Sequence, residues 1–526
     1  MMMFGCFFDA YHHLLLRILL LSYVSAMMGV HEQQSNDEQW EAKFYYYAAL
    51  DSLNGDQTVV ELPSFLELNS ATRHYREMAD GILKRLALSH EVALRTEEIL
   101  MSKSQSSSTQ MSLSHHLEKK ISKSAELLEH NAFVLEEILK PFPVEGIPII
   151  ETQSIKLRNT FPSEAAETSE YTLARYIPPY YGTNKKDDIN EEQPYEEAVQ
   201  IIAHLTRDWS KDGSVIRDQT FGWIKQTLWS HHYESADSAV SSPLSPILVP
   251  GAGTGRLAFD LAFAYDEKCT SGCMLQFPFA VEAMDNSITM AAAANYMFHI
   301  TYKDDTILTK NDTNSNGKLK IHPFVSDSLS NEVDTQRRWD SAIIPEESVL
   351  NQLHNVHKQS PHQRPKLSYT VGDFVTTYSL PSKREAYGSL VTLFFIDTAT
   401  NIYEYIFTIH HLLRNGGVWI NYGPVQWHRN SQLHPSTNEL RDMIQLGGFE
   451  ILYWEISEEL VAYRHPDDDL GSSRSTRSEA YRPLKFVAVK SDPSSKNGKD
   501  DCLLSSIEEV RLMTGRRSIV NLDHDD

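Results

Sequence analysis

The stretch Pro246-Ile-Leu-Val-Pro-Gly-Ala-Gly-Thr-Gly-Arg256 decides the fold class of this 526-residue chain. Its apolar run predicts a buried strand, three glycines follow at once, and Leu257-Ala-Phe-Asp-Leu-Ala262 predicts the start of a helix. This order is typical of a nucleotide site in an α/β fold, because glycine lets the backbone turn tightly and approach a ligand. Arg256 stands where a dinucleotide fingerprint needs glycine or alanine, and no Gly-Lys-Ser/Thr follows as in a phosphate-binding loop. A tight strand-to-helix turn without a ligand is the alternative.

Strand and helix patterns alternate after the glycine turn, which predicts a parallel sheet covered by helices on both faces. Glycine pairs at 416–417 and 447–448 are expected to end the helices 401–414 and 437–446. Seven predicted strands, with the last two close together, fit a Rossmann-like methyltransferase sheet in which a short final strand inserts antiparallel. The predicted strands are 247–249, 279–285, 366–371, 389–397, 417–423, 449–457 and 484–490.

The rest of the chain divides by pattern. Helical spacing, which begins with Trp40, Phe44, Tyr47 and Leu50, predicts a helical N-terminal domain over residues 37–140. The irregular segment 141–190 is expected to be a linker, 191–490 the methyltransferase domain and 491–526 a polar tail. Within residues 1–36, the apolar run 14–30 predicts a signal peptide, a short membrane anchor or a disordered leader, although Arg17 interrupts it.

Charge and cysteine content weigh against several classes of protein. The formal net charge is −23, from 48 basic and 71 acidic residues, which argues against a nucleic-acid binder. Four cysteines make no disulfide framework, and Cys269 and Cys273 lack the second pair that a metal site needs, so no metal is expected. A small or cationic substrate fits this composition better.

Acidic residues stand where the predicted strands end, and ligands of such sheets bind beyond the carboxyl ends of the strands. Asp285 follows the second strand, Asp373 and Phe374 the third, and Asp397 the fourth. We expect Asp285 to accept hydrogen bonds from ribose hydroxyls and Asp373 one from an adenine amino group, with the Phe374 ring beside the base. A helix N-cap or a solvated turn is the alternative for any single acid. The fifth strand is followed by the polar candidates Asn421, Trp427 and His428.

Several stretches together resemble the carnosine N-methyltransferase family, and the resemblance covers about residues 40–490 with gaps. It implies a Rossmann-like class I methyltransferase sheet of about seven strands with a helical N-terminal domain. It also implies an enzyme that moves a methyl group from S-adenosylmethionine to a histidine imidazole nitrogen of carnosine, giving anserine, or of a related peptide. The stretches are Glu129-His-Asn131, Arg207-Asp-Trp-Ser210, Leu248-Val-Pro-Gly-Ala-Gly-Thr-Gly-Arg-Leu257, Ile321-His-Pro-Phe324, Gly372-Asp-Phe374, Phe394-Phe-Ile-Asp-Thr-Ala399 and Trp419-Ile-Asn-Tyr-Gly-Pro424.

The resemblance also implies the site residues, position by position. Three positions depart from the family: His204 replaces a glutamine, which weakens the contact there, Asp285 replaces a glutamate, and Thr400 replaces a histidine. The substrate-binding positions fall on Asp397, His428 and, by a looser match, Tyr481. The implied cofactor-binding positions are His204, Arg207, Gly251, Gly253, Gly255, Asp285, Asp373, Phe374 and Leu393.

Imidazole chemistry makes Asp397 and His428 the catalytic candidates. Attack through one ring nitrogen requires the other to hold the proton, and an anionic acceptor fixes that tautomer and stabilises the growing positive charge. We assign this role to Asp397 with help from His428, whose alternative role is to bind the substrate carboxylate or backbone. Trp427, Phe394 and Phe395 are candidates to wall the site, or else ordinary core residues.

Three functions stay open from the sequence: a dipeptide methyltransferase, a protein-histidine methyltransferase and a non-catalytic scaffold. We expect a small histidine-containing peptide as the partner, a homodimer as the assembly, and the cytoplasm, with the nucleus as a second compartment, as the location. Membrane association or secretion would follow only if the N-terminal apolar run acts as an anchor or a signal.

Overall fold

The computed structural model describes residues 41–46, 51–53, 57–59, 64–103, 112–142, 145–146, 193–234, 246–264, 280–300, 318–326, 332–357, 364–463, 476 and 479–491. The predicted leader, Cys269 and Cys273, most of the predicted linker and nearly all of the polar tail lie outside these residues. In the described part, no helix is long and apolar enough to cross a membrane. The same residues contain no cluster of three or more His, Cys, Asp or Glu side chains arranged to hold a metal ion.

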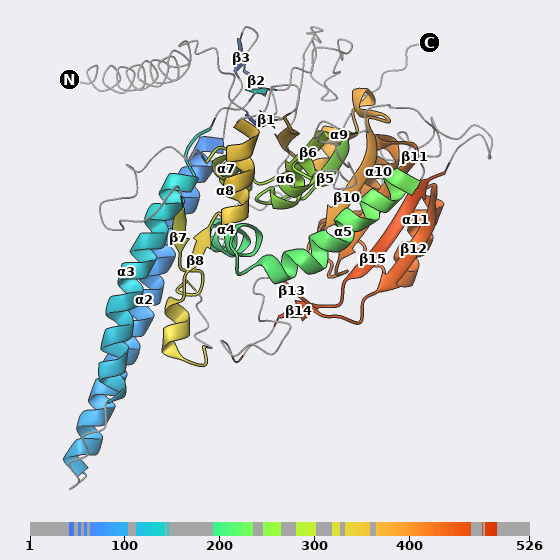
Figure 1. Ribbon diagram of the computed structural model, residues 1–526. Helices are drawn as coiled ribbons and strands as arrows, with labels where there is room; N and C mark the ends of the chain where they lie inside the picture. Colours follow the sequence, from blue (N-terminus) through green and yellow to red (C-terminus); the bar gives the residue numbers. More distant parts are fainter. Residues whose placement is uncertain are drawn as a thin grey trace, which may run out of the picture.

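A nine-stranded sheet forms the centre of the molecule, in the order β12-β15-β11-β10-β5-β6-β9-β1-β4 (Figure 1). Strand β15 runs antiparallel to both of its neighbours, and all the other pairs are parallel. The Rossmann-like methyltransferase sheet with an antiparallel final strand is thereby confirmed. Its seven predicted strands are β5 (Ile247–Pro250), β6 (Ala280–Asp285), β9 (Lys366–Val371), β10 (Tyr387–Leu393), β11 (Leu413–Gly423), β12 (Phe449–Ile456) and β15 (Leu484–Lys490).

Two further strands, β1 (Lys43–Tyr46) and β4 (Glu145–Gly146), extend the sheet beyond β9. The prediction of a helix that begins near Trp40 is therefore wrong at residues 43–46, which form a strand. Phe44 is only 3% exposed, stacks on Tyr369 at 5.4 Å and meets the ring edge of Phe142 at 5.3 Å. Aromatic residues favour strands, and pairing with the edge of β9 outweighs the helical spacing of the local sequence. Within the predicted linker, Phe142 belongs to the core and β4 belongs to the sheet.

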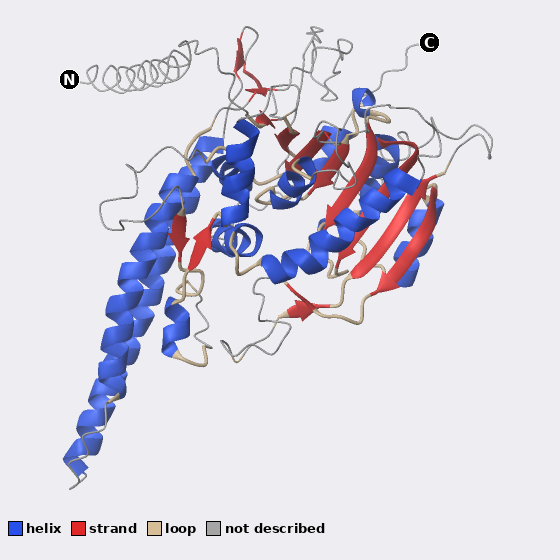
Figure 2. Ribbon diagram, in the orientation of Figure 1, coloured by secondary structure: helices blue, strands red, loops and turns tan. Residues whose placement is uncertain are grey.

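The helical prediction is confirmed further along, in the long helices α2 (Ser64–Lys103) and α3 (Leu113–Ile138). They lie side by side and project as an arm from the body (Figure 2). Asn131 fastens α3 to the body by two bonds with one residue: its amide donates to the His322 carbonyl at 2.8 Å and accepts from the His322 N–H at 2.9 Å. His322 directly follows β7 (Leu319–Ile321), which pairs with β8 (Ala342–Ile344).

Helices cover both faces of the sheet, with a separate apolar core on each face. Strand β5 shows the alternation: Ile247 and Val249 belong to one core and Leu248 to the other, because successive strand residues point to opposite faces. The first core includes α4 (Gln193–Trp209), α5 (Ser214–Glu234), α6 (Arg256–Ala262), α7 (Ile288–Phe298) and α8 (Glu347–His357). The second includes α9 (Phe374–Tyr378), α10 (Ile402–Leu412) and α11 (Thr437–Leu446).

The two predicted glycine stops behave differently. Helix α11 ends at Leu446 with Gly447 as its C-cap, as predicted. Helix α10 already ends at Leu412, because Leu413 adopts an extended backbone and aligns with Tyr387 of β10. The pair at 416–417 therefore lies within β11, and the prediction that it ends the helix is wrong. The remaining short elements are β2 (Asp51–Leu53), β3 (Gln57–Val59), β13 (Val461–Ala462), β14 (Ala480–Tyr481), η2 (Thr335–Trp339), η4 (Pro381–Lys383) and η5 (Ile396–Thr398).

Candidate active site

The turn after β5 requires its three glycines. Gly251, Gly253 and Gly255 have φ angles of +66°, +53° and +79°, a region that side chains disfavour. A Cβ atom on Gly251 would lie 2.3 Å from the Phe395 ring, and one on Gly255 would lie 2.6 Å from the Phe298 ring. Gly251 therefore shapes the turn toward β10, whereas Gly255 lets α6 pack against α7.

A pocket lies beside this turn, between β5, α4 and the end of β10. It contains five of the nine predicted cofactor positions: His204, Arg207, Gly251, Gly253 and Leu393. Its other lining residues are Asp208, Phe221, Val249, Ala252, Arg256, Leu257, Phe394 and Tyr463. The structure thus brings two residues of α4 to the glycine turn, as the resemblance implied.

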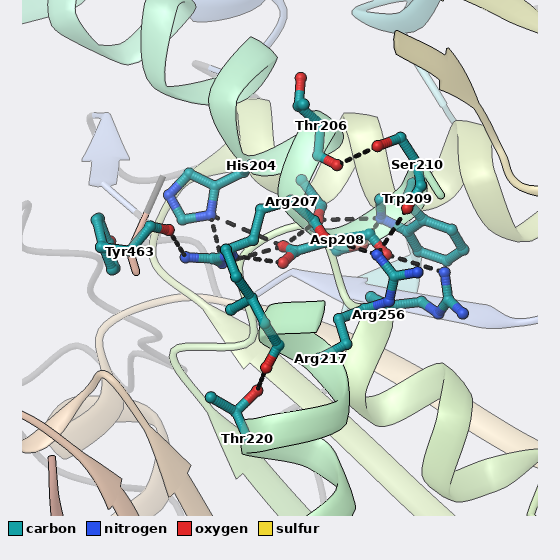
Figure 3. A network of polar contacts seen from close by, with 12 residues as sticks. His204, Thr206, Arg207, Asp208, Trp209, Ser210, Arg217, Thr220, Arg256 and Tyr463 are labelled. Carbon is teal, nitrogen blue, oxygen red and sulfur yellow. Dashed lines mark hydrogen bonds and ion pairs between the residues drawn. The ribbon is translucent and has the colours of Figure 1, made fainter. Parts of the chain in front are cut away.

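Arg207 is one of the two arginines that line this pocket, and Asp208 holds its guanidinium group (Figure 3). The Arg207 Nε and NH2 groups donate to the two Asp208 oxygens at 2.6 and 3.1 Å, and NH2 lies 2.9 Å from His204 Nδ1. Burial acts to raise the pKa of Asp208, but Arg207 and His204 outweigh it and lower that pKa well below the ordinary value. Asp208 also accepts a hydrogen bond from the Thr254 hydroxyl at 2.9 Å, which ties α4 to the glycine turn.

Two aromatic residues close the pocket around Arg207. The guanidinium carbon lies 5.2 Å from the ring centre of Tyr463 and 5.9 Å from that of Phe394. The Tyr463 carbonyl also accepts from Arg207 NH1 at 3.4 Å. Phe394 was a candidate wall residue, and its positive φ of 52° marks a sharp turn after β10. Tyr463 was missed, because it directly follows the two-residue strand β13 and lies 256 positions from Arg207.

Asp285 ends β6 next to the same turn. Its Oδ2 accepts the Gly253 N–H at 2.9 Å, and its Oδ1 accepts the Ser287 N–H at 3.0 Å. The side chain stays partly exposed. Asp285 therefore holds the turn from a position that a ligand can reach.

Asp373 and Phe374 each have a structural role at the start of α9. Asp373 is the N-cap of α9 and accepts the Thr376 N–H at 2.8 Å, which is the alternative role named for such an acid. The Phe374 ring is only 2% exposed and meets the Phe395 and Tyr405 rings edge-on at 5.4 and 5.1 Å. Core packing thus encloses most of this ring, and its place beside an adenine stays a prediction.

Asp397 and His428 come together beyond the end of β10. Asp397 lies on η5, four positions after the pocket residue Leu393, and is 6% exposed. Its Oδ2 accepts the Gln426 N–H at 3.0 Å, and its carbonyl accepts the His428 N–H at 3.1 Å. Burial raises the pKa of Asp397 to about 6. The His428 side chain is exposed, so the pair combines a buried carboxylate with an imidazole open to a ligand.

Two other polar side chains of the sheet lie outside the site. Glu282 of β6 accepts from the Thr370 and Tyr378 hydroxyls at 2.8 and 2.6 Å. Asn421 is fully buried in β11, accepts from the Thr392 hydroxyl at 2.8 Å and donates to the Leu484 carbonyl at 3.0 Å. Both side chains hold the sheet together, and the expectation of Asn421 as a site residue is wrong.

Tyr481 lies in β14, which pairs with β13. Its ring centre is 6.1 Å from that of the pocket residue Tyr463, at an interplanar angle of 82°. The structure thus places Tyr481 next to the pocket wall, on the strand pair that carries Tyr463.

The comparisons with known proteins agree with this architecture. The protein-family model described as carnosine N-methyltransferase matches residues 184–492. The carnosine N-methyltransferase of Dictyostelium discoideum is 26% identical over 309 residues, which cover 57% of this chain and 56% of that protein. The Schizosaccharomyces pombe protein of the same name is 26% identical, with 56% of this chain and 70% of that protein covered.

The Mus musculus carnosine N-methyltransferase is 28% identical over 295 residues, which cover 55% of this chain and 62% of that protein. The match to this chain thus spans from 56% to 70% of the length of these curated relatives. The matching family model itself covers more than half of the present chain, from before α4 to the end of β15. This chain belongs to the carnosine N-methyltransferase family.

Proposed function

We propose that this protein is an S-adenosylmethionine-dependent N-methyltransferase that methylates a histidine imidazole nitrogen of carnosine, giving anserine, or of a related histidine-containing peptide. Family membership supports the reaction class. The observation that carries the proposal is Asp397, a buried carboxylate four residues beyond the pocket-lining Leu393.

The pocket residues fit the proposed cofactor. The glycine turn exposes backbone without Cβ atoms, so a ligand can approach it closely. Arg207 offers a guanidinium group suited to the methionine carboxylate, and Asp285 offers carboxylate oxygens suited to ribose hydroxyls. When bound, the cofactor supplies a sulfonium methyl group that is already activated for transfer. The protein mainly has to orient the two reactants for in-line attack.

Asp397 would control the proton on the substrate ring. With a pKa raised to about 6, the carboxyl group is mostly ionised at pH 7. It can then accept the N–H of one imidazole nitrogen, which leaves the other nitrogen free to attack. The same negative charge stabilises the positive charge that grows on the ring during methylation. The Gln426 N–H fixes one carboxylate oxygen, and His428 is positioned next to it through its backbone.

A protein histidine presents the same imidazole as carnosine does, so the test must distinguish the two substrates. We would incubate the purified protein with methyl-labelled S-adenosylmethionine and a whole-cell extract, then separate small molecules from proteins. We expect the label in the small-molecule fraction. Label confined to proteins would point to a protein-histidine methyltransferase, and no label in either fraction would contradict methyl transfer altogether.

A further inference from the structure

The last turn of α4 carries Arg207 and Asp208, and its end is held by the side chains of Ser210, just after the helix, and of one arginine each from α5 and α6 (Figure 3). The last four carbonyl groups of an α-helix have no partner within the helix. Here Ser210 Oγ donates to the Thr206 carbonyl at 2.6 Å, and Arg217 NH1 donates to the Arg207 carbonyl at 2.7 Å. Arg256 NH1 donates to the Asp208 carbonyl at 2.9 Å.

Glu346 completes this set in two ways. Its backbone N–H donates to the Trp209 carbonyl at 2.8 Å, so all four carbonyl groups at the end of α4 are satisfied. Its carboxylate accepts from Arg217 NH2 at 2.9 Å and from Arg256 NH2 at 2.5 Å. One carboxylate thus fixes two guanidinium groups whose other nitrogens hold the helix end.

Glu346 itself does not line the pocket, and its side chain is 14% exposed. It lies between β8 and α8, in the part of the chain that also joins the α3 arm. The backbone of Gly213, just before α5, packs directly against the end of α4, because a Cβ atom there would lie 1.8 Å from the Arg207 carbonyl oxygen.

We propose that Glu346 is a positioning residue: it fixes the two arginines that hold the last turn of α4, and so sets where Arg207 lies in the cofactor pocket. This inference rests on the proposed function, since it assigns Arg207 to cofactor binding. From the end of α4, the contacts continue to the glycine turn through the Arg207–Asp208 pair and through the Thr254 hydroxyl, which donates to Asp208. Glu346 thereby connects the β8–α8 segment with the glycine turn.

The test is Glu346→Gln in the full-length protein, because the amide keeps the shape and removes the charge that both arginines share. We expect the affinity for S-adenosylmethionine, measured by calorimetry, to fall about tenfold or more. The kcat at saturating cofactor and the KM for carnosine should stay within about twofold of the wild type, because neither Asp397 nor His428 contacts this group. Glu346→Asp, which restores the charge, should recover part of the lost affinity.

Glu332→Gln is the matched control. Glu332 is also a carboxylate between two cations, with Lys120 at 2.5 Å and Arg338 at 3.4 Å, and its side chain is 13% exposed. It lies away from α4, so its variant should keep wild-type cofactor affinity. Equal losses of affinity in the two variants would show a general effect of losing a buried charge and would overturn the positioning role.

Arg217→Lys gives the second test if the glutamine variant does not fold, because lysine lacks the planar fork with which Arg217 reaches the Arg207 carbonyl through NH1 and Glu346 through NH2. The same loss of cofactor affinity is expected, and wild-type affinity in this folded variant would overturn the inference. If the wild type binds S-adenosylmethionine and Glu346→Gln binds it equally well, only the positioning role fails. If the wild type does not bind the cofactor, the proposed function fails and this inference fails with it.

Discussion

Asp397→Asn should make the protein more stable and nearly inactive. Burial raises the pKa of Asp397 from 3.8 to about 6, so the fold holds the ionised form at a cost. One pKa unit corresponds to 1.36 kcal/mol, and a shift of about two units gives an upper value of about 3 kcal/mol. Asparagine carries no charge and its oxygen can still accept the Gln426 N–H. The variant should therefore gain up to about 3 kcal/mol of unfolding free energy at pH 7.5.

The sign of the pH dependence follows from the same shift. The folded state binds the Asp397 proton more tightly than the unfolded chain does, so the cost grows as pH rises from about 4 to about 6 and is complete above that window. The stability difference between the variant and the wild type should accordingly shrink as pH is lowered toward 4. Urea unfolding at several pH values measures this difference.

Asp208→Asn provides a control of opposite sign. The pKa of Asp208 lies below its ordinary value, and Arg207 depends on its charge. That variant should be less stable than the wild type at pH 7.5. Its deficit should shrink only in strong acid, where the wild-type carboxylate also takes up a proton.

The activity of Asp397→Asn supplies the second readout. Methyl transfer to carnosine should fall by about a hundredfold or more, the usual scale for losing a charged partner in the transition state. Affinity for S-adenosylmethionine should stay near the wild-type value, because Asp397 does not line the described pocket. Wild-type kcat/KM below pH 6 should fall as Asp397 is protonated. A variant that turns over like the wild type, or that is less stable at pH 7.5, would refute this assignment.

Two further substitutions test the cofactor side of the site. Asp373→Ala should weaken S-adenosylmethionine binding by about 1–3 kcal/mol and remove the N-cap of α9, at about 1 kcal/mol of stability. Asp373→Ser should restore the N-cap of α9 but not the affinity for S-adenosylmethionine. If calorimetry gives the serine variant the wild-type affinity for the cofactor, Asp373 has a structural role only. Gly251→Ala should lower the unfolding free energy by about 2 kcal/mol or more, because its φ is +66° and the new Cβ would lie 2.3 Å from the Phe395 ring. Gly416→Ala is the control for backbone strain alone, because Gly416 has a φ of +73° and no atom lies near the position of its new Cβ. If the two variants lose the same unfolding free energy, the argument from the contact with the Phe395 ring is contradicted.

The sequence predicted the fold well where the signals are local. An apolar run followed by three glycines specifies a strand and a turn within eleven residues, and the structure places both as expected. Strand β1 could not be found in this way, because the pairing that creates it joins Lys43 to Ser368, far along the chain. The helical spacing around Phe44 predicted a helix there, because it carries no information about the pairing with β9.

The candidate site was predicted unevenly. Residues in local motifs, such as Gly251 and Arg207, do line the pocket. Side chains that act through distant partners, such as Tyr463 and Glu346, carry no sequence signal, because a single tyrosine or glutamate has no distinctive neighbours. The sequence also did not reveal how deeply the Phe374 ring is buried, since an aromatic residue beside an acid can equally be a core residue next to a helix N-cap.

The most direct test of the account is one measurement on purified protein. Methyl-labelled S-adenosylmethionine is mixed with carnosine, and the product is identified by NMR, with β-alanyl-alanine as the acceptor that lacks an imidazole. We predict that the label appears on an imidazole nitrogen of carnosine and that β-alanyl-alanine acquires none. A protein that binds the cofactor but leaves carnosine unlabelled, or that labels both dipeptides equally, would contradict the central claim.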